Sequence, residues 1–174
     1  MPQLNALAMP LLKFFVLGFC LAVAGCSYRP LYGTSADGQS VAVALSGISI
    51  EEQKERTGQL VRNELVSSLG PSADGTSRYM LKLEPVEKTI NLSSLPGQKL
   101  ERKRYRLNVK YVLVSTATGQ VAQEGASFAT VSYDTVLQPI ADLQAAENAR
   151  VRATREVAED IRLRLAAFLS AKSG

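Results

Sequence analysis

Alternating apolar and polar residues in the middle of the chain predict three neighbouring strands. Tyr79, Leu81 and Leu83 alternate with Met80, Lys82 and Glu84, which is the period of a half-buried strand. The clearest strand follows, with one apolar face (Tyr105, Leu107, Val109, Tyr111, Leu113) and one polar face (Arg104, Arg106, Asn108, Lys110). Residues 116–120 predict a hairpin turn, after which Val121–Tyr133 returns as the next strand. We expect these three strands to be antiparallel.

Pro85 ends the first of these strands or places it at the edge of the sheet, because proline lacks the N–H that a central strand needs. The less regular segment 86–96 then extends the strand before a loop at 95–98.

Apolar positions at helical spacing predict a helix on each side of these strands. Glu51–Leu69 forms the first, because Val61, Leu65 and Leu69 fall on one stripe. Acidic residues crowd its start, where they suit the positive end of the helix dipole, and Gly70-Pro71 ends it. The second helix begins near Pro139. Its length of about 30 residues is unusual for a globular protein, which leaves room for a break.

The segment 41–50 also alternates and predicts one further strand, with a bulge near Ser46-Gly47. The element order is then β-α-β-β-β-α. We therefore expect an α+β fold, a two-layer sandwich in which two helices pack on one face of a four-stranded, largely antiparallel sheet.

The first 26 residues predict a lipoprotein signal peptide. Lys13 is their only charged residue, and the apolar run that follows it is shorter than the roughly 20 residues that a membrane-spanning helix needs. Val23-Ala24-Gly25 precedes Cys26 as in a lipobox, in which small residues fit the peptidase and the thiol accepts the lipid. An ordinary cleaved signal with a chance cysteine is the alternative, and Met9 is a second candidate start.

We thus expect a cleaved peptide at 1–25, a lipidated N-terminus and tether at 26–40, and a single domain at 41–174. Several acyl chains on Cys26 would hold the protein on a membrane without crossing it. Ser27, in place of aspartate, is compatible with sorting to the outer membrane.

Composition excludes several kinds of chemistry. The 174-residue chain has no histidine and two cysteines, one of which falls in the leader. Ser-His-Asp catalysis, histidine-ligated metal and a structural disulfide are therefore ruled out. We expect no enzyme activity, no catalytic residues, no bound metal and no cofactor.

Basic residues cluster between the predicted loop and the clearest strand. The cluster consists of Lys99, Arg102, Lys103, Arg104 and Arg106, opposed only by Glu101. Arginine forks suit phosphate oxygens, so the cluster is a candidate site for an anionic ligand. The alternative is that these charges solvate a strand end. An exported chain rarely meets nucleic acid, so we expect no nucleic-acid partner.

The layout resembles a known family. A lipobox followed by Cys26-Ser-Tyr-Arg-Pro-Leu-Tyr-Gly33, the strands around 104–113, Ser132-Tyr-Asp134 and the Ala/Arg-rich segment 148–158 are similar to the LPS-assembly lipoprotein (LptE) family. The resemblance covers nearly all of the mature chain, and the opening motif is its most specific part.

The resemblance implies a lipid-anchored protein on the periplasmic side of the cell outer membrane. Such a protein plugs the LptD β-barrel, assists its assembly and takes part in delivering lipopolysaccharide to the outer leaflet, without a cofactor. The basic cluster then supplies candidate contacts to lipopolysaccharide or to the barrel. An accessory lipoprotein of a periplasmic lipid-transport ABC system is the alternative function; a periplasmic hydrolase is disfavoured by the absence of histidine.

Overall fold

The α+β prediction is confirmed by the computed structural model, which describes residues 41–70, 77–94, 101–136 and 138–172. Cys26, the tether, the turn at 71–76, the loop at 95–98 and Lys99 lie outside the described residues. The elements, in chain order, are α2 (Val41–Ser46), β1 (Ile48–Ile50), α3 (Arg56–Leu69), β2 (Tyr79–Ser94), β3 (Glu101–Ser115), β4 (Val121–Thr135) and α4 (Pro139–Lys172).

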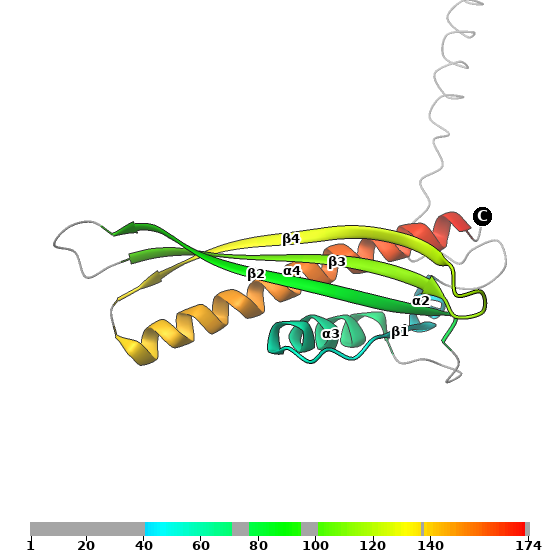
Figure 1. Cartoon of the computed structure of the whole chain (residues 1–174), viewed down its shortest axis with the longest axis horizontal. Coiled ribbons are helices and arrows are strands. Elements are labelled where there is room, and N and C mark those ends of the chain that lie inside the picture. The colour runs from blue at the N-terminus through cyan, green and yellow to red at the C-terminus, as the bar shows by residue number, and fades with distance from the viewer. Residues whose placement is uncertain (1–40, 71–76, 95–100, 137, 173–174) are drawn as a thin grey trace, which may run out of the picture. The chain divides into compact units, whose positions relative to one another are not determined.

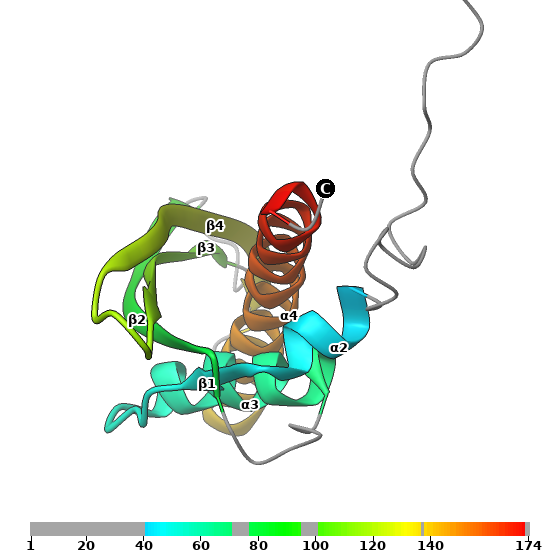
Figure 2. The ribbon, with the colours of Figure 1, turned by 90° about the vertical axis from the view of Figure 1, so that its right-hand side faces the viewer.

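The four strands form one sheet in the order β1-β2-β3-β4. β1 is parallel to β2, whereas β2, β3 and β4 are antiparallel as predicted. The helices lie on one side of this sheet, with α3 and α4 side by side beneath it (Figures 1 and 2). The other side, here called the outer face, has no helix over it among the described elements.

Period-2 alternation sorts the side chains of β3 onto these two sides. Its apolar face from Tyr105 to Leu113 is buried against the helices, while Arg104, Arg106 and Lys110 are exposed on the outer face. Burying each leucine or valine contributes about 1.5–3 kcal/mol. A register slip of one residue would expose all of them, so the alternation specifies the register.

β2 continues beyond the regularly alternating residues 79–84 and ends at Ser94, which confirms the predicted extension of the strand. β1 pairs with β2 only at residues 79–81, so at Pro85 the strand has a neighbour, β3, on one side only. The predicted position of Pro85 at the edge of the sheet is confirmed. The hairpin turn between β3 and β4 is also confirmed, and Gly119 adopts a φ of 68° there, a conformation that glycine tolerates best.

α4 is a single helix of 34 residues without a break. Its buried stripe begins with alanines (Ala149, Ala153) and continues with Val157, Ile161 and Leu165. α3 runs parallel to α4, since Arg56 pairs with Glu147 at 2.6 Å and Glu64 with Arg155 at 3.7 Å. In the described part of the chain, no helix combines the length and the apolar character needed to span a membrane.

The prediction of one strand over 41–50 is wrong for its first half. Residues 41–46 form α2, and only Ile48–Ile50 is a strand. The sequence Val-Ala-Val-Ala-Leu fits both periods, because Val41 and Leu45 are also four residues apart. Both side chains are buried while Val43 is exposed, so packing against the other helices selects the helical alternative.

The first long helix begins at Arg56, five residues later than predicted. Its acidic residues Glu51 and Glu52 precede it, and Glu55 occupies the N-cap position without a side-chain capping bond. The backbone of 51–55 follows the edge of β2 instead, where the Glu51 amide donates to the Leu81 carbonyl at 3.0 Å. Pairing with the sheet therefore competes successfully with the helix.

Gly125 allows the Tyr111 ring to cross β4. The two residues face each other in the β3–β4 register, and a Cβ at Gly125 would lie 2.6 Å from Tyr111 Oη and 2.7 Å from Cζ. The large, buried ring thus occupies the space that any side chain would need.

Replacing Gly125 with alanine should therefore destabilise the fold by about 1–3 kcal/mol, the usual cost of overpacking. Urea unfolding measures this cost. In a Tyr111→Ala background, the same Gly125→Ala change should cost much less, because the clash is gone. An equal cost in both backgrounds would contradict the packing explanation.

Candidate binding surface on the outer face of the sheet

The structure divides the predicted basic cluster between the two faces of the sheet. Arg102, Arg104 and Arg106 are exposed on the outer face. Lys103 points to the opposite face, where its Nζ lies 3.8 Å from Glu101 Oε2. Lys99 lies outside the described residues. Sequence proximity therefore overstated the cluster, because adjacent strand residues point to opposite sides.

Arg102 is committed to an intramolecular partner. Its Nε and Nη2 donate to the two carboxylate oxygens of Asp134 at 2.8 and 3.1 Å, a bidentate geometry. These hydrogen bonds lower the pKa of Asp134 and raise that of Arg102. Arg102 thus joins β3 to β4 and is less available to an external anion than its neighbours.

The remaining arginines gain a third basic residue from β2. Lys88 is exposed and lies directly opposite Arg106 in the β2–β3 register, while Ile90 lies opposite Arg104. Like charges that face each other across strands destabilise a sheet by a few tenths of a kcal/mol or more. An anion bound between Lys88 and Arg106 would relieve this repulsion.

Apolar side chains surround these charges. The Arg106 guanidinium lies 5.3 Å from the ring centre of Phe128, a cation–π distance. Phe128 is nonetheless 63% exposed, and Val86 is also 63% exposed. We call Lys88, Arg104, Arg106, Val86, Ile90 and Phe128 the outer-face patch. It combines cations with exposed apolar surface, as a ligand that carries both phosphates and acyl chains would require.

Lys88, Ile90 and Phe128 were not among the residues predicted from the sequence. The predicted extension of this strand over 86–96 implies that Lys88 and Ile90 share a face, but it does not identify the residues that lie opposite them. Their position beside Arg104 and Arg106 depends on the strand register, which the sequence of β2 alone does not specify.

A polar cluster on the inner face links the sheet to both long helices. Glu87 Oε2 accepts hydrogen bonds from Tyr105 Oη at 2.5 Å, Thr57 Oγ1 at 2.9 Å and Arg150 Nε at 3.3 Å. Arg150 also binds Glu147 at 2.6 Å. Burial raises the pKa of Glu87, but these hydrogen bonds and the Arg150 charge lower it further, and the net shift is downward.

The same cluster raises the pKa of Tyr105 to about 12, through burial first and then through the bond to Glu87. Each side chain in it is hydrogen-bonded or ion-paired to another side chain of the cluster. Because the groups join α3, β2, β3 and α4 in this way, we assign them to stability rather than to catalysis.

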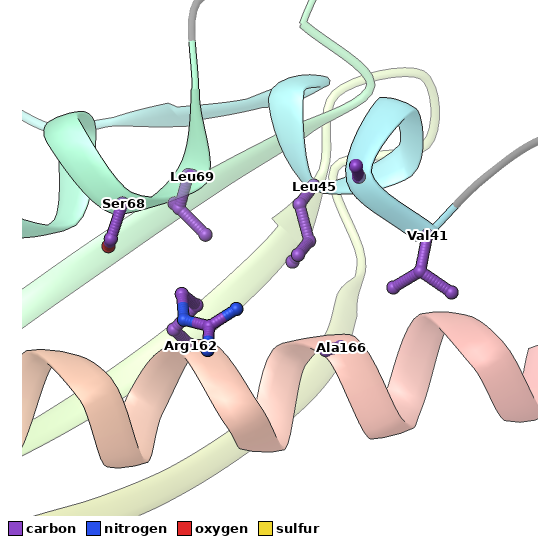
Figure 3. A pocket seen from close by; sticks show the side chains of 7 residues that line it. Val41, Leu45, Ser68, Leu69, Arg162 and Ala166 are labelled. Atoms are coloured by element: carbon purple, nitrogen blue, oxygen red, sulfur yellow. The ribbon is translucent and has the colours of Figure 1, made fainter. Parts of the chain in front are cut away.

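A small cleft opens between α2, α3 and α4 (Figure 3). Val41, Leu45, Leu69 and Ala166 line it, together with Ser68 and Arg162. Its volume of about 100 Å³ is below the roughly 300 Å³ at which small-molecule pockets begin. No group of three or more potential metal ligands occurs among the described residues.

Comparison with solved structures supports a class of protein. No family model matches the chain, and no curated protein gives a significant match. A protein of Caulobacter crescentus CB15, described as a lipoprotein, is similar, with 28% identity, a TM-score of 0.68 and coverage of 77% of this chain and 98% of that one. A minor lipoprotein of Acinetobacter baumannii shares the fold at 17% identity and a TM-score of 0.51, over 69% and 88% of the two chains.

The likeness to the Caulobacter protein supports a membrane-anchored envelope lipoprotein, while the Acinetobacter structure shows the shared fold alone. The class agrees with the sequence prediction of a lipobox. The attachment site at Cys26 itself remains a prediction.

The inner cluster makes stability depend on pH at the alkaline end. The folded state keeps the Tyr105 proton up to a pKa of about 12, whereas an unfolded tyrosine loses it near 10. Stability from this group is complete below about pH 10 and is lost as the pH rises towards 12. The unfolding free energy should fall by about 2 kcal/mol more in the native chain than in Tyr105→Phe over this range. Urea titrations of both proteins at several pH values measure the difference, and parallel curves would refute the assignment.

Proposed function

We propose that the protein is an outer-membrane assembly subunit, not an enzyme, that takes part in exporting lipopolysaccharide. Anchored through Cys26 on the periplasmic side, it would plug the LptD β-barrel, assist its folding and deliver lipopolysaccharide to the outer leaflet. The lipobox, the opening motif and the lipoprotein fold of the solved neighbours support this proposal.

The observation that carries the ligand assignment is the outer-face patch. Lipopolysaccharide joins acyl chains to phosphates, and the patch places Lys88, Arg104 and Arg106 beside exposed Val86, Ile90 and Phe128. Guanidinium groups can bind phosphate oxygens, while the apolar side chains would lie against hydrocarbon. No polar group has to leave the core to make these contacts.

Depletion and purification test the cellular role. Depleting the protein should leave the partner barrel misassembled and remove lipopolysaccharide from the cell surface, since the plug would be missing. Purified in mild detergent, the chain should carry an outer-membrane β-barrel with it. Normal surface lipopolysaccharide after depletion would refute the proposal. Co-purification of inner-membrane transport components would favour the ABC accessory function instead.

Charge reversal tests the ligand site. The sequence alone would select Arg102, Lys103 and Arg104 for reversal to glutamate; the structure moves the informative set to Lys88, Arg104 and Arg106. Reversing this set should weaken lipopolysaccharide binding by at least about tenfold, if each lost charged hydrogen bond contributes about 1.5 kcal/mol.

Lys103→Glu provides the matched control for the single reversal Arg104→Glu, because it makes the same charge change on the same strand but on the inner side of the sheet. It should leave the affinity within about twofold, since surface charges on that side are screened from the patch. Circular dichroism checks that each variant folds. Equal loss in both proteins would show that net charge, not the patch, determines binding.

A further inference from the structure

The outer edge of β4 is a second candidate interaction surface. β4 is the last strand of the sheet, so the backbone groups on one side of it have no strand partner among the described residues. The register identifies these groups. In β2 the carbonyl of Leu81 faces away from β3, towards Glu51. Backbone groups alternate in direction along each strand, so the register across β3 places the N–H and C=O groups of the even-numbered residues from Glu124 to Asp134 on the open edge of β4. All of these residues are exposed.

The opposite edge of the sheet is protected. The Leu81 carbonyl accepts from the Glu51 amide, and the Leu83 carbonyl accepts from Gln53 Nε2 at 3.4 Å. Pro85 has no N–H to offer there, and Lys82 and Lys88 flank it. Lysine, proline and a covering segment are the usual means of preventing strand addition at an edge.

The β4 edge has neither of the two residue types, lysine and proline, that protect the opposite edge. Val121–Thr135 contains no lysine, arginine or proline, and the stretch from Gly125 to Tyr133 is uncharged. It includes Phe128, Val131 and Tyr133, residue types that favour extended structure. Among the described residues, no backbone hydrogen bond from outside the sheet reaches this strand.

The side chains beside this edge indicate which strand it would accept. On the outer face β4 carries the small residues Ala126, Thr130 and Ser132, opposite Lys110, Arg106 and Arg104 of β3. An added strand would lie roughly 10 Å from β3. Acidic side chains on it could reach across these small residues towards the β3 cations. Phe128 would contact an apolar residue of the added strand.

We propose that the outer edge of β4 binds an extended segment of another protein by strand addition, and that this segment presents acidic and apolar residues on the outer face. A second copy of the chain fits less well. Its own β4 offers only Glu124 and Asp134 on that face, and Asp134 is already paired with Arg102. It would also bring a second set of Arg104 and Arg106 to the interface.

The probe is a nine-residue peptide, Glu-Val-Glu-Val-Phe-Val-Glu-Val-Glu, added to the full chain in mild detergent. Fluorescence anisotropy measures binding, and hydrogen exchange followed by NMR reports each β4 amide. With its phenylalanine opposite Phe128 the peptide spans residues 124 to 132, so we expect it to slow exchange selectively at the even-numbered amides from 124 to 132. A peptide with lysine in place of glutamate should bind at least about tenfold more weakly, because it meets like charge.

Variants at Thr130 separate backbone pairing from side-chain effects. Thr130→Pro removes one outward N–H and should weaken peptide binding about fivefold, the effect of one hydrogen bond. Thr130→Ala keeps that N–H and should stay within about twofold. Thr130→Glu adds an edge charge that repels the acidic peptide and should weaken its binding even if the proline variant folds poorly.

Three results would overturn the proposal: no binding of the acidic peptide, equal binding of a fully N-methylated peptide, or a dimer whose even-numbered β4 amides are protected without any peptide. The last result would identify a second copy as the occupant. Because Thr130→Pro leaves Lys88, Arg104 and Arg106 in place, its lipopolysaccharide affinity should not change. Failure of strand addition is therefore distinguishable from failure of the proposed function.

Discussion

The packing of α4 against the apolar face of the sheet is the contact on which the rest of the structure depends. α4 buries a stripe that starts with Ala149 and Ala153 and ends with Leu165 and Leu169. Small residues in the first half of the stripe let neighbouring elements approach closely, and α3 lies alongside this half at Glu147 and Arg155. Larger apolar side chains follow from Val157 onward. The helix then supplies the surface that selects the helical form of 41–46 and the parallel course of α3.

A one-sided helix layer determines what the sheet can do. Every described helix lies on the inner side (Figure 2), so the outward side chains of β2, β3 and β4 are free to contact something else. The charges on this outer face differ in whether they have a partner of opposite charge. Arg102 is neutralised by Asp134, whereas Lys88 and Arg106 face each other with like charge, a local cost that a bound anion would remove.

The inner polar cluster shows how the two layers are aligned. Glu87 receives hydrogen bonds from a residue of α3, a residue of β3 and a residue of α4. Apolar packing tolerates small shifts, but hydrogen bonds are directional. The Glu87 carboxylate therefore specifies the position of α3 and α4 along the strands. Its partners come from three other elements, and no local sequence pattern could have identified them as a group.

The local sequence pattern alone determined those elements whose apolar spacing fits only one type of secondary structure. The strict alternation of β3 placed Tyr105 and Tyr111 in the core and Arg104 and Arg106 outside, and the absence of histidine excluded whole classes of chemistry. Where two periods fit, as in 41–45, or where a sheet edge competes for the backbone, as in 51–55, only tertiary packing decided. The outer-face patch belongs to this second kind: strand register, which depends on the buried faces of all the strands together, brought Lys88 and Phe128 beside Arg106 and turned Lys103 away.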